Sequence, residues 1–248
     1  MMLGTAAAVA VFVAEGRRRG RLDDRLFAVL VGSLVCGALA AKLSTAWRYL
    51  ASAPDPSLLG MLVSGGKSVL GGLAGAYLGA LLTKRLIGYR DSTGDVFAPA
   101  VALGIGLGRI GCLLTEPPGT PTGLPWGVVV DAERAARIPG FPSAWTGVPL
   151  HPSFAYEIAF HLVLFTVLLR LRSRADLRGE LFKLFLLAYA VFRFFVEFVR
   201  GNEAVWHGLT RSQLFLMPSA LLLAGYFIRR FRRRSPAYGG PVPEALDA

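Results

Sequence analysis

The sequence has little charge. Only 17% of its 248 residues are Asp, Glu, Lys or Arg, whereas 54% are hydrophobic. A soluble domain has about 25% charged residues, and the apolar residues of this chain gather in blocks of roughly 20, the length of a membrane-spanning helix. This distribution excludes an ordinary soluble domain, and the composition excludes a disordered chain. The sequence therefore predicts an all-α polytopic membrane protein.

Metal-binding and redox patterns are also missing. The two cysteines, Cys36 and Cys112, lie in apolar blocks without a CxxC partner or a nearby histidine, which excludes a disulfide scaffold and a zinc site. His161 and His207 have no second ligand at metal spacing. The glycine-rich stretch at Ser64–Gly79 lacks the GxxxxGK[ST] pattern of a phosphate loop. No metal, nucleotide or other cofactor is predicted.

The apolar residues form seven blocks, which predict about seven transmembrane helices. They lie near Met2–Ala14, Leu26–Ala46, Leu58–Leu82, Val96–Leu114, Ser153–Leu169, Leu181–Val199 and Leu209–Ile228. We expect residues 1–235 to be one integral membrane domain, in which the proline-rich loop 116–150 makes a small ordered cap on the outer face. The Pro/Gly-rich segment 236–248 is predicted to be a disordered cytoplasmic tail.

The basic residues outside the blocks predict the orientation. Seven spans place 17 of them on one side of the membrane and 5 on the other. Because cytoplasmic loops carry the excess of Lys and Arg, the N-terminus is predicted outside and the C-terminus in the cytoplasm. The net charge of +11 is then a feature of membrane topology, and no nucleic-acid partner is predicted.

Charged residues inside apolar blocks are functional candidates, because burial in hydrocarbon costs several kcal/mol unless they are paired. Arg109 lies in the glycine-rich stretch GIGLGRIG, and Arg193, Glu197 and Arg200 follow one another at spacings of 4 and 3. This spacing puts the last three on one helical face. One interpretation is a structural Arg193–Glu197 pair with Arg200 reaching the interface. The other is a set of three cations that binds a phosphate-bearing lipid headgroup.

The fifth block opens with His151-Pro152-Ser153-Phe154-Ala155-Tyr156-Glu157. Proline and serine suit the first turn of a helix, and His151 is interpreted as a capping or proton-transfer group. Glu157 lies about 9 Å further along the helix, where we expect it to pair with an arginine of another helix. Lys67 is expected to pair with a carboxylate or a headgroup inside the bundle.

Five segments of the chain, in order, resemble the bacterial prolipoprotein diacylglyceryl transferases. They are Gly108-Arg109-Ile110-Gly111 with Glu116 and the following Gly119–Gly127, then His151–Glu157, Arg178–Phe182, Phe192–Arg200 and Leu209–Gln213. The resemblance covers the chain from about Ser64 to Gly225. It implies a multi-pass enzyme of the bacterial inner membrane that transfers the diacylglyceryl group of phosphatidylglycerol to the lipobox cysteine thiol of a prolipoprotein.

The resemblance also implies partners and residue roles. The partners would be phosphatidylglycerol or a similar anionic phospholipid and the signal peptide of a prolipoprotein. Arg109 and Arg193 would hold the phosphate, with Glu197 orienting an arginine. The remaining implied site residues are Arg200 near the interface, Glu116 and Gly119 below the outer cap, and Tyr156 on the substrate-binding side. His151 and Lys67 are candidate bases that we infer from the chain's own residues, apart from the resemblance.

The chain departs from the family pattern at several positions. Leu70 replaces the family histidine, Cys112 and Thr115 replace two asparagines, Thr120 replaces an arginine, and the N-terminal tyrosine motif is absent. Three readings follow: a diverged transferase with another acceptor, a standard transferase with a relocated base, or a non-catalytic phospholipid-binding or structural homologue. A transporter is disfavoured, because no inverted repeat relates the halves.

Overall fold

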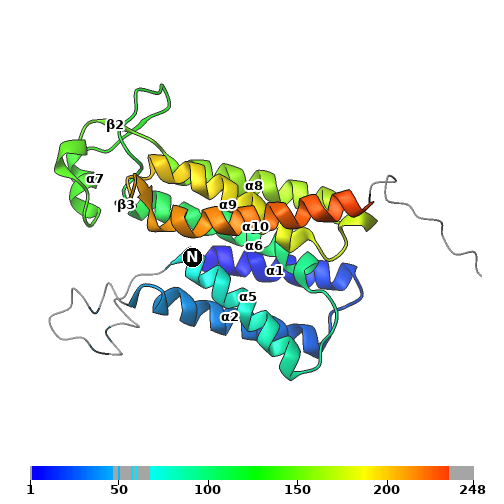
Figure 1. Cartoon of the computed structure of the whole chain (residues 1–248). Helices are drawn as coiled ribbons and strands as arrows, with labels where there is room; N and C mark the ends of the chain where they lie inside the picture. Colours follow the sequence, from blue (N-terminus) through cyan, green and yellow to red (C-terminus); the bar gives the residue numbers. More distant parts are fainter. Residues whose placement is uncertain (1, 47–49, 51–56, 58–59, 61–67, 235–248) are drawn as a thin grey trace, which may run out of the picture. The chain divides into compact units, whose positions relative to one another are not determined.

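The computed structural model describes residues 2–46, 50, 57, 60 and 68–234. Within these residues, one long helix falls in each predicted apolar block (Figure 1). These helices are α1 (Met2–Arg18), α2 (Asp24–Leu43), α5 (Val69–Leu86), α6 (Gly94–Thr115), α8 (Ser153–Leu171), α9 (Leu181–Val196) and α10 (Arg211–Arg234). Four of them, α2, α6, α8 and α10, have segments long and apolar enough to cross a membrane. The helical class and its membrane-spanning helices are thus supported, while seven spans stay a prediction.

Side-chain caps explain where two of the helices begin. A helix start leaves backbone N–H groups without partners, and a side-chain oxygen just before it can accept one of them. Asp23 accepts from the backbone N–H of Leu26 at 2.7 Å before α2. Ser68 accepts from the N–H of Gly71 at 3.1 Å before α5. Lys67 lies outside the described residues, as do 235–248, where the tail was predicted.

The chain divides into two compact units, of which one is Val11–Val96. Its main contact is between α2 and α5, and glycines set how close these helices come. A Cβ on Gly75 would lie 2.6 Å from the carbonyl oxygen of Cys36, and a Cβ on Gly79 would lie 2.6 Å from the Cβ of Cys36. The glycines of this stretch therefore serve helix packing, and Cys36 packs against one of them.

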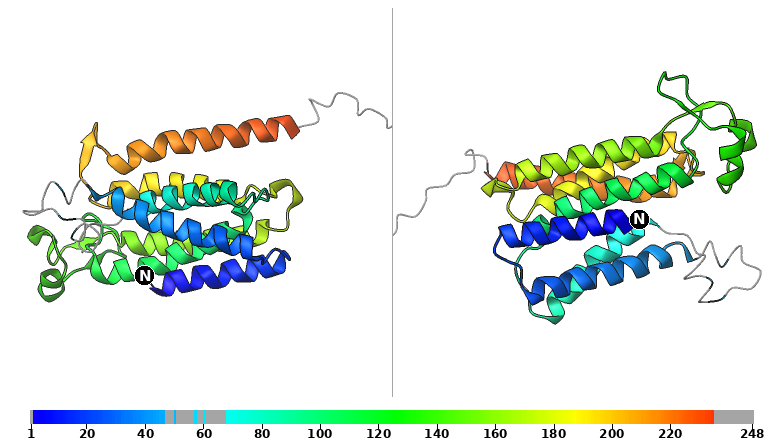
Figure 2. Two further views of the ribbon diagram at one scale, coloured as in Figure 1. Left: turned by 90° about the horizontal axis from the view of Figure 1, so that it is seen from below. Right: turned by 180° about the vertical axis from the view of Figure 1, so that it is seen from behind.

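The other unit comprises the described parts of Met1–Ala10 and Phe97–Ala248. Helices α8, α9 and α10 run alongside one another in it (Figures 1 and 2). Close packing extends to α6, where a Cβ on Gly106 would lie 3.0 Å from the Cβ of His161 on α8. Gly106, in the GIGLGRIG stretch, therefore lets α6 pack closely against α8.

The segment predicted as a cap, 116–150, is ordered and has its own small core. It contains β1 (Val128–Val129), α7 (Ala132–Arg137), the 3₁₀ turn η1 (Ser143–Trp145) and β2 (Pro149–Leu150), which pairs antiparallel with β1. The core residues are Val130, Ile138 and Leu150, with Ala135, Phe141 and Trp145 packed against them. Its outer-face location stays a prediction.

Helix α9 ends before the predicted block does. It stops at Val196, and Glu197–Val199 form a 3₁₀ turn, η3. A short antiparallel hairpin follows, made of β3 (Ala204–Trp206) and β4 (Leu209–Thr210), and α10 begins directly after it. Arg200 therefore lies beyond the helix that carries Arg193, and the three charges predicted to share one helical face do not lie on one continuous helix.

Candidate functional site

A buried carboxylate on α8, Glu157, is shared by two arginines. Its Oε2 lies 2.6 Å from Nε of Arg109 on α6, and its Oε1 lies 2.7 Å from Nη1 of Arg200 after η3. The Glu157 side chain has no exposed surface, and those of Arg109 and Arg200 are only 10% and 14% exposed. The prediction that Glu157 pairs with an arginine of another helix is confirmed.

A second buried carboxylate, Glu197, has one arginine and two neutral partners. Its Oε2 lies 2.5 Å from Nη1 of Arg193, one turn earlier. Its Oε1 accepts hydrogen bonds from Nδ2 of Asn202 at 2.8 Å and from Oγ1 of Thr210 at 3.0 Å. The predicted pair between Arg193 and Glu197 is therefore present, and both side chains are buried.

We call Arg109, Arg193, Arg200, Glu157 and Glu197 the arginine cluster. The Arg200 guanidinium lies 4.5 Å from the centre of the Phe154 ring and that of Arg109 lies 5.9 Å from it. Arg200 also interacts electrostatically with Arg193 and Glu197, which links the two carboxylates in one site. Burial lowers the pKa of Arg200 from its ordinary value, and the nearby positive charge of Arg193 lowers it further. With three cations and two carboxylates, the cluster itself carries one excess positive charge.

Backbone hydrogen bonds tie the segment after α6 to the residues beside the cluster. The N–H of Gly119 donates to the His151 carbonyl at 2.7 Å, and the N–H of Thr120 donates to the Val199 carbonyl at 2.9 Å. A Cβ on Gly119 would collide with the carbonyl oxygen of Val199. Only glycine permits this close crossing of three chain segments, so the structure places Gly119 in the framework around the cluster.

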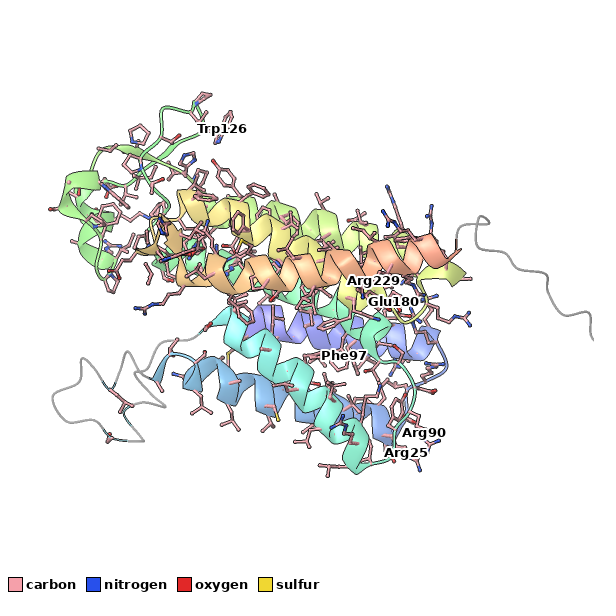
Figure 3. All side chains as sticks on the ribbon, in the orientation of Figure 1. Arg25, Arg90, Phe97, Trp126, Glu180 and Arg229 are labelled. Carbon is pink, nitrogen blue, oxygen red and sulfur yellow. The ribbon has the colours of Figure 1, made fainter. Side chains whose placement is uncertain are left out.

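His151 and Tyr156 lie together at the start of α8. Nδ1 of His151 is 3.3 Å from the hydroxyl oxygen of Tyr156, which also accepts a hydrogen bond from Nε1 of Trp126 at 2.9 Å. Depending on its tautomer, the imidazole donates to or accepts from this hydroxyl. Figure 3 labels Trp126, on the segment that follows α6. The sequence placed His151 and Tyr156 in one segment but did not indicate that Trp126 reaches them.

The residues that follow Arg109 lead toward the end of α6. Nη1 of Arg109 lies 3.9 Å from Sγ of Cys112, and the backbone N–H of Glu116 donates to the Cys112 carbonyl at 2.8 Å. The Glu116 side chain is exposed, one residue past the end of the helix. Leu70, which the sequence resemblance aligns with a histidine, lies in the first turn of α5 in the other unit.

Asn202, Thr210 and Gln213 are site neighbours that residue-by-residue reasoning did not single out. The N–H of Thr210 donates to Oε1 of Gln213 at 2.9 Å, and the N–H of Gln213 donates to Oγ1 of Thr210 at 3.3 Å. This reciprocal arrangement is a capping box at the start of α10, and a T-x-x-Q pattern before an apolar run is its sequence signature. That signal could have located two of the three residues.

The fold and the site define a helical membrane protein with a buried cluster of arginines and carboxylates whose net charge is positive. The family model of the prolipoprotein diacylglyceryl transferases matches residues 1–229. The chain belongs to this family, which confirms the resemblance seen in the sequence.

Curated relatives are also named as prolipoprotein diacylglyceryl transferases. The phosphatidylglycerol–prolipoprotein diacylglyceryl transferase of Chromohalobacter salexigens is 36% identical over 238 residues, covering 89% of this chain and 83% of that protein. The protein of the same name from Teredinibacter turnerae is 35% identical, covering 90% and 75% respectively. A Clostridium perfringens relative, named as the second such transferase, is 29% identical, covering 90% and 84%. No solved structure matches the chain.

Proposed function

We propose that this protein transfers the diacylglyceryl group of phosphatidylglycerol to the thiol of a prolipoprotein cysteine. The observation that carries the proposal is the excess positive charge of the buried arginine cluster. A buried cation without a counter-charge is costly, so the cluster suits a ligand that brings a negative charge. The phosphate of an anionic phospholipid is such a ligand, and the names of the relatives specify phosphatidylglycerol.

The cluster can assist the reaction at its leaving group. The thiol sulfur forms a bond to the carbon of the diacylglyceryl group that carries the phosphate ester. The bond from that carbon to the ester oxygen breaks. Glycerol 1-phosphate leaves with the electron pair, and the thiol proton passes to a base. Arg109 and Arg193 would bind the phosphate, and guanidinium groups already held in place stabilise its growing charge without rearranging. Arg200 would be the third cation of the phosphate site, and Glu197 would orient Arg193.

His151 is our candidate for the base. Its ring contacts the Tyr156 hydroxyl, so a proton taken up at one ring nitrogen can be balanced by a hydrogen bond at the other. Tyr156 would orient the ring on the substrate-binding side, while Glu116 and Gly119 would shape the entrance. Lys67 is the second candidate, at a position outside the described residues.

For the membrane arrangement we propose seven spans, with the N-terminus outside and the C-terminus in the bacterial cytoplasm. The 17-to-5 distribution of basic residues supports this orientation. One long helix in each apolar block supports the number of spans. The segment 116–150 would then cover the outer end of the site, where the signal peptide of a prolipoprotein arrives.

Two alternatives follow from specific residues. Leucine cannot accept a proton, so Leu70 in place of histidine favours a transferase with another acceptor or a non-catalytic phospholipid-binding protein. Cys112 in place of asparagine is a second change, and this cysteine lies beside Arg109. The variant Cys112→Asn restores the asparagine and tests whether the cysteine is adaptive. A large gain in the rate of transfer would mean that the cysteine arose by neutral drift.

Complementation tests the proposal directly. The gene is expressed in a bacterium depleted of its own transferase, and a reporter prolipoprotein is assayed by mass spectrometry for the added diacylglyceryl group. We expect rescue by the unchanged protein and none by Arg109→Ala produced at the same level in the membrane. A well-expressed protein that leaves the reporter unmodified would exclude the standard reaction, and binding of phosphatidylglycerol would then separate the two alternatives.

A further inference from the structure

We propose that Asn202 and Thr210 are positioning residues for the phosphate-binding arginines. They fix the Glu197 carboxylate, which in turn fixes the guanidinium of Arg193. The inference rests on the proposed function, since it assumes that Arg193 binds the phosphate of the lipid. It extends that function to the region of the β3–β4 hairpin: Thr210 ends β4, and Asn202 lies two residues before β3.

The two donors meet on a single oxygen of Glu197. Nδ2 of Asn202 and Oγ1 of Thr210 both donate to Oε1, at 2.8 and 3.0 Å, which leaves Oε2 facing Nη1 of Arg193 at 2.5 Å. Three directions of contact hold the planar carboxylate and so limit its rotation. The position of the Arg193 fork is then set by residues that carry no charge.

Uncharged hydrogen-bond donors to Glu197 matter because the cluster contains a third arginine, Arg200. Arg200 follows η3 only three residues after Glu197, yet its guanidinium pairs with Glu157. A Glu197 carboxylate free to turn could pair with Arg200 instead of Arg193, because Arg200 already interacts electrostatically with it. With Oε1 occupied by Asn202 and Thr210, Arg193 keeps Glu197 and Arg200 keeps Glu157.

The composition of the chain makes this arrangement unusual. Asn202 is the only asparagine and Gln213 the only glutamine among the 248 residues. Asn202 donates to Glu197, and Gln213 accepts from the N–H of Thr210 while its Nε2 donates to the Phe194 carbonyl at 3.1 Å. Both side-chain amides of the chain thus act on the same short stretch around Glu197.

A purely structural role is the competing explanation. Thr210 and Gln213 cap α10, and loss of a cap lowers helix stability without any effect on chemistry. The two roles separate at Asn202, which is exposed and takes no part in the cap. Thr210 does not separate them by itself, because serine keeps both the cap and the donor while valine removes both.

Steady-state kinetics of the full chain in phosphatidylglycerol vesicles tests the proposal. Asn202→Asp keeps the side-chain shape, removes the donor and places a like charge beside Glu197. We therefore expect kcat to fall about 10- to 100-fold with a smaller change in KM, at least the effect of losing a hydrogen bond to a buried charge. Thr210→Val should fall similarly and Thr210→Ser should stay near the unchanged protein. Thr166→Val is the matched control, because its hydroxyl donates only to the Leu162 carbonyl within α8. Lower thermal stability of Asn202→Asp and Thr210→Val with an unchanged kcat would overturn the proposal.

A spectroscopic measurement keeps the inference separate from the transfer reaction. Selective ¹⁵N-asparagine labelling gives a single side-chain amide signal, because the chain has one asparagine. We expect this signal to shift between phosphatidylcholine nanodiscs and nanodiscs that contain phosphatidylglycerol, and the shift to vanish in Arg109→Ala. If the protein transfers nothing but the signal shifts, the proposed reaction fails and the positioning role stands. If transfer occurs and the signal does not shift, the positioning role fails alone.

Discussion

Each end of α9 carries a buried carboxylate that pairs with cations. The two ends differ in how much of the cationic side chains is exposed to water. At the start of the helix, Glu180 pairs with Nζ of Lys183 at 2.7 Å and with Nη1 of Arg230 at 3.2 Å, and it accepts a hydrogen bond from the Tyr226 hydroxyl at 2.9 Å. Figure 3 labels Glu180 beside Arg229, at the end of the helices opposite Trp126. We call Glu180, Lys183, Arg230 and Tyr226 the Glu180 cluster.

Both clusters contain one more cation than carboxylate, but the excess has a different meaning in each. Lys183 and Arg230 are 34% and 23% exposed, so water or a lipid headgroup can solvate them at the protein edge. The three arginines of the arginine cluster are at most 14% exposed. A charge excess calls for a bound anion only where burial denies the cations water. The comparison therefore favours the proposed anion at the arginine cluster and a structural role for the Glu180 cluster.

The largest difference is expected when the shared carboxylate is neutralised. Glu157→Gln leaves Arg109 and Arg200 buried without a counter-charge, and breaking a buried pair in this way costs about 3–5 kcal/mol. The free energy of unfolding in detergent micelles, followed by denaturant titration, measures the loss. A protein that tolerates Glu157→Gln with less than about 1 kcal/mol would show that water reaches both arginines, and the contrast between the clusters would disappear.

Exchanging the type of cation should affect transfer at one end only. Arg109→Lys keeps the charge but loses the planar fork that meets a phosphate with two hydrogen bonds. We expect the initial rate of diacylglyceryl transfer to fall at least about 100-fold, the effect of removing one fixed transition-state donor. Lys183→Arg in the Glu180 cluster is the control and should keep the full rate. Near-normal transfer by Arg109→Lys would mean that Arg109 does not bind the phosphate as a fork.

The backbone crossing beside the arginine cluster should be as intolerant of a methyl group as a packed core. Gly119→Ala forces a Cβ against the Val199 carbonyl, and overpacking of this kind costs about 1–3 kcal/mol. Gly123→Ala, four residues later, meets nothing within 4 Å and serves as the matched control. Equal stability of the two variants would show that the segment after α6 can move away from the cluster without cost.

How far the sequence predicts this site depends on the distance between partners along the chain. The pair of Arg193 and Glu197 follows from helical spacing, and Glu157 was expected to find an arginine because a carboxylate at that depth needs a partner. Arg200 could not be placed, since α9 ends at Val196 and helical periodicity stops with it. Its pairing with Glu157 depends on how α8 and α9 pack, which residue spacing does not encode.

The hairpin after α9 was not predicted from the sequence either, because it also brings together residues that are distant along the chain. Leu209–Thr210 were read as the start of an apolar helix, whereas they form β4, and only a turn brings Thr210 back to Glu197. That turn uses His207 and Gly208, both with positive φ. A two-residue loop with two positive φ angles is the usual hairpin turn, but glycine alone signals it in the sequence, because a positive φ is uncommon for any other residue.

The smallest effect is expected at the Glu180 cluster, and it completes the comparison. Glu180→Gln removes the charge but leaves an amide oxygen that can accept from Tyr226 and an amide group of similar size. Because Lys183 and Arg230 are partly exposed, water replaces most of the lost attraction, and the pairs contribute about 0–1 kcal/mol as surface ion pairs do. We expect a loss of at most about 1 kcal/mol in the micelle titration used for Glu157→Gln, and an unchanged rate of transfer. A loss as large as that of Glu157→Gln would mean that exposure of the cations does not separate the two ends of α9, and the excess charge of the arginine cluster would no longer argue for a bound anion.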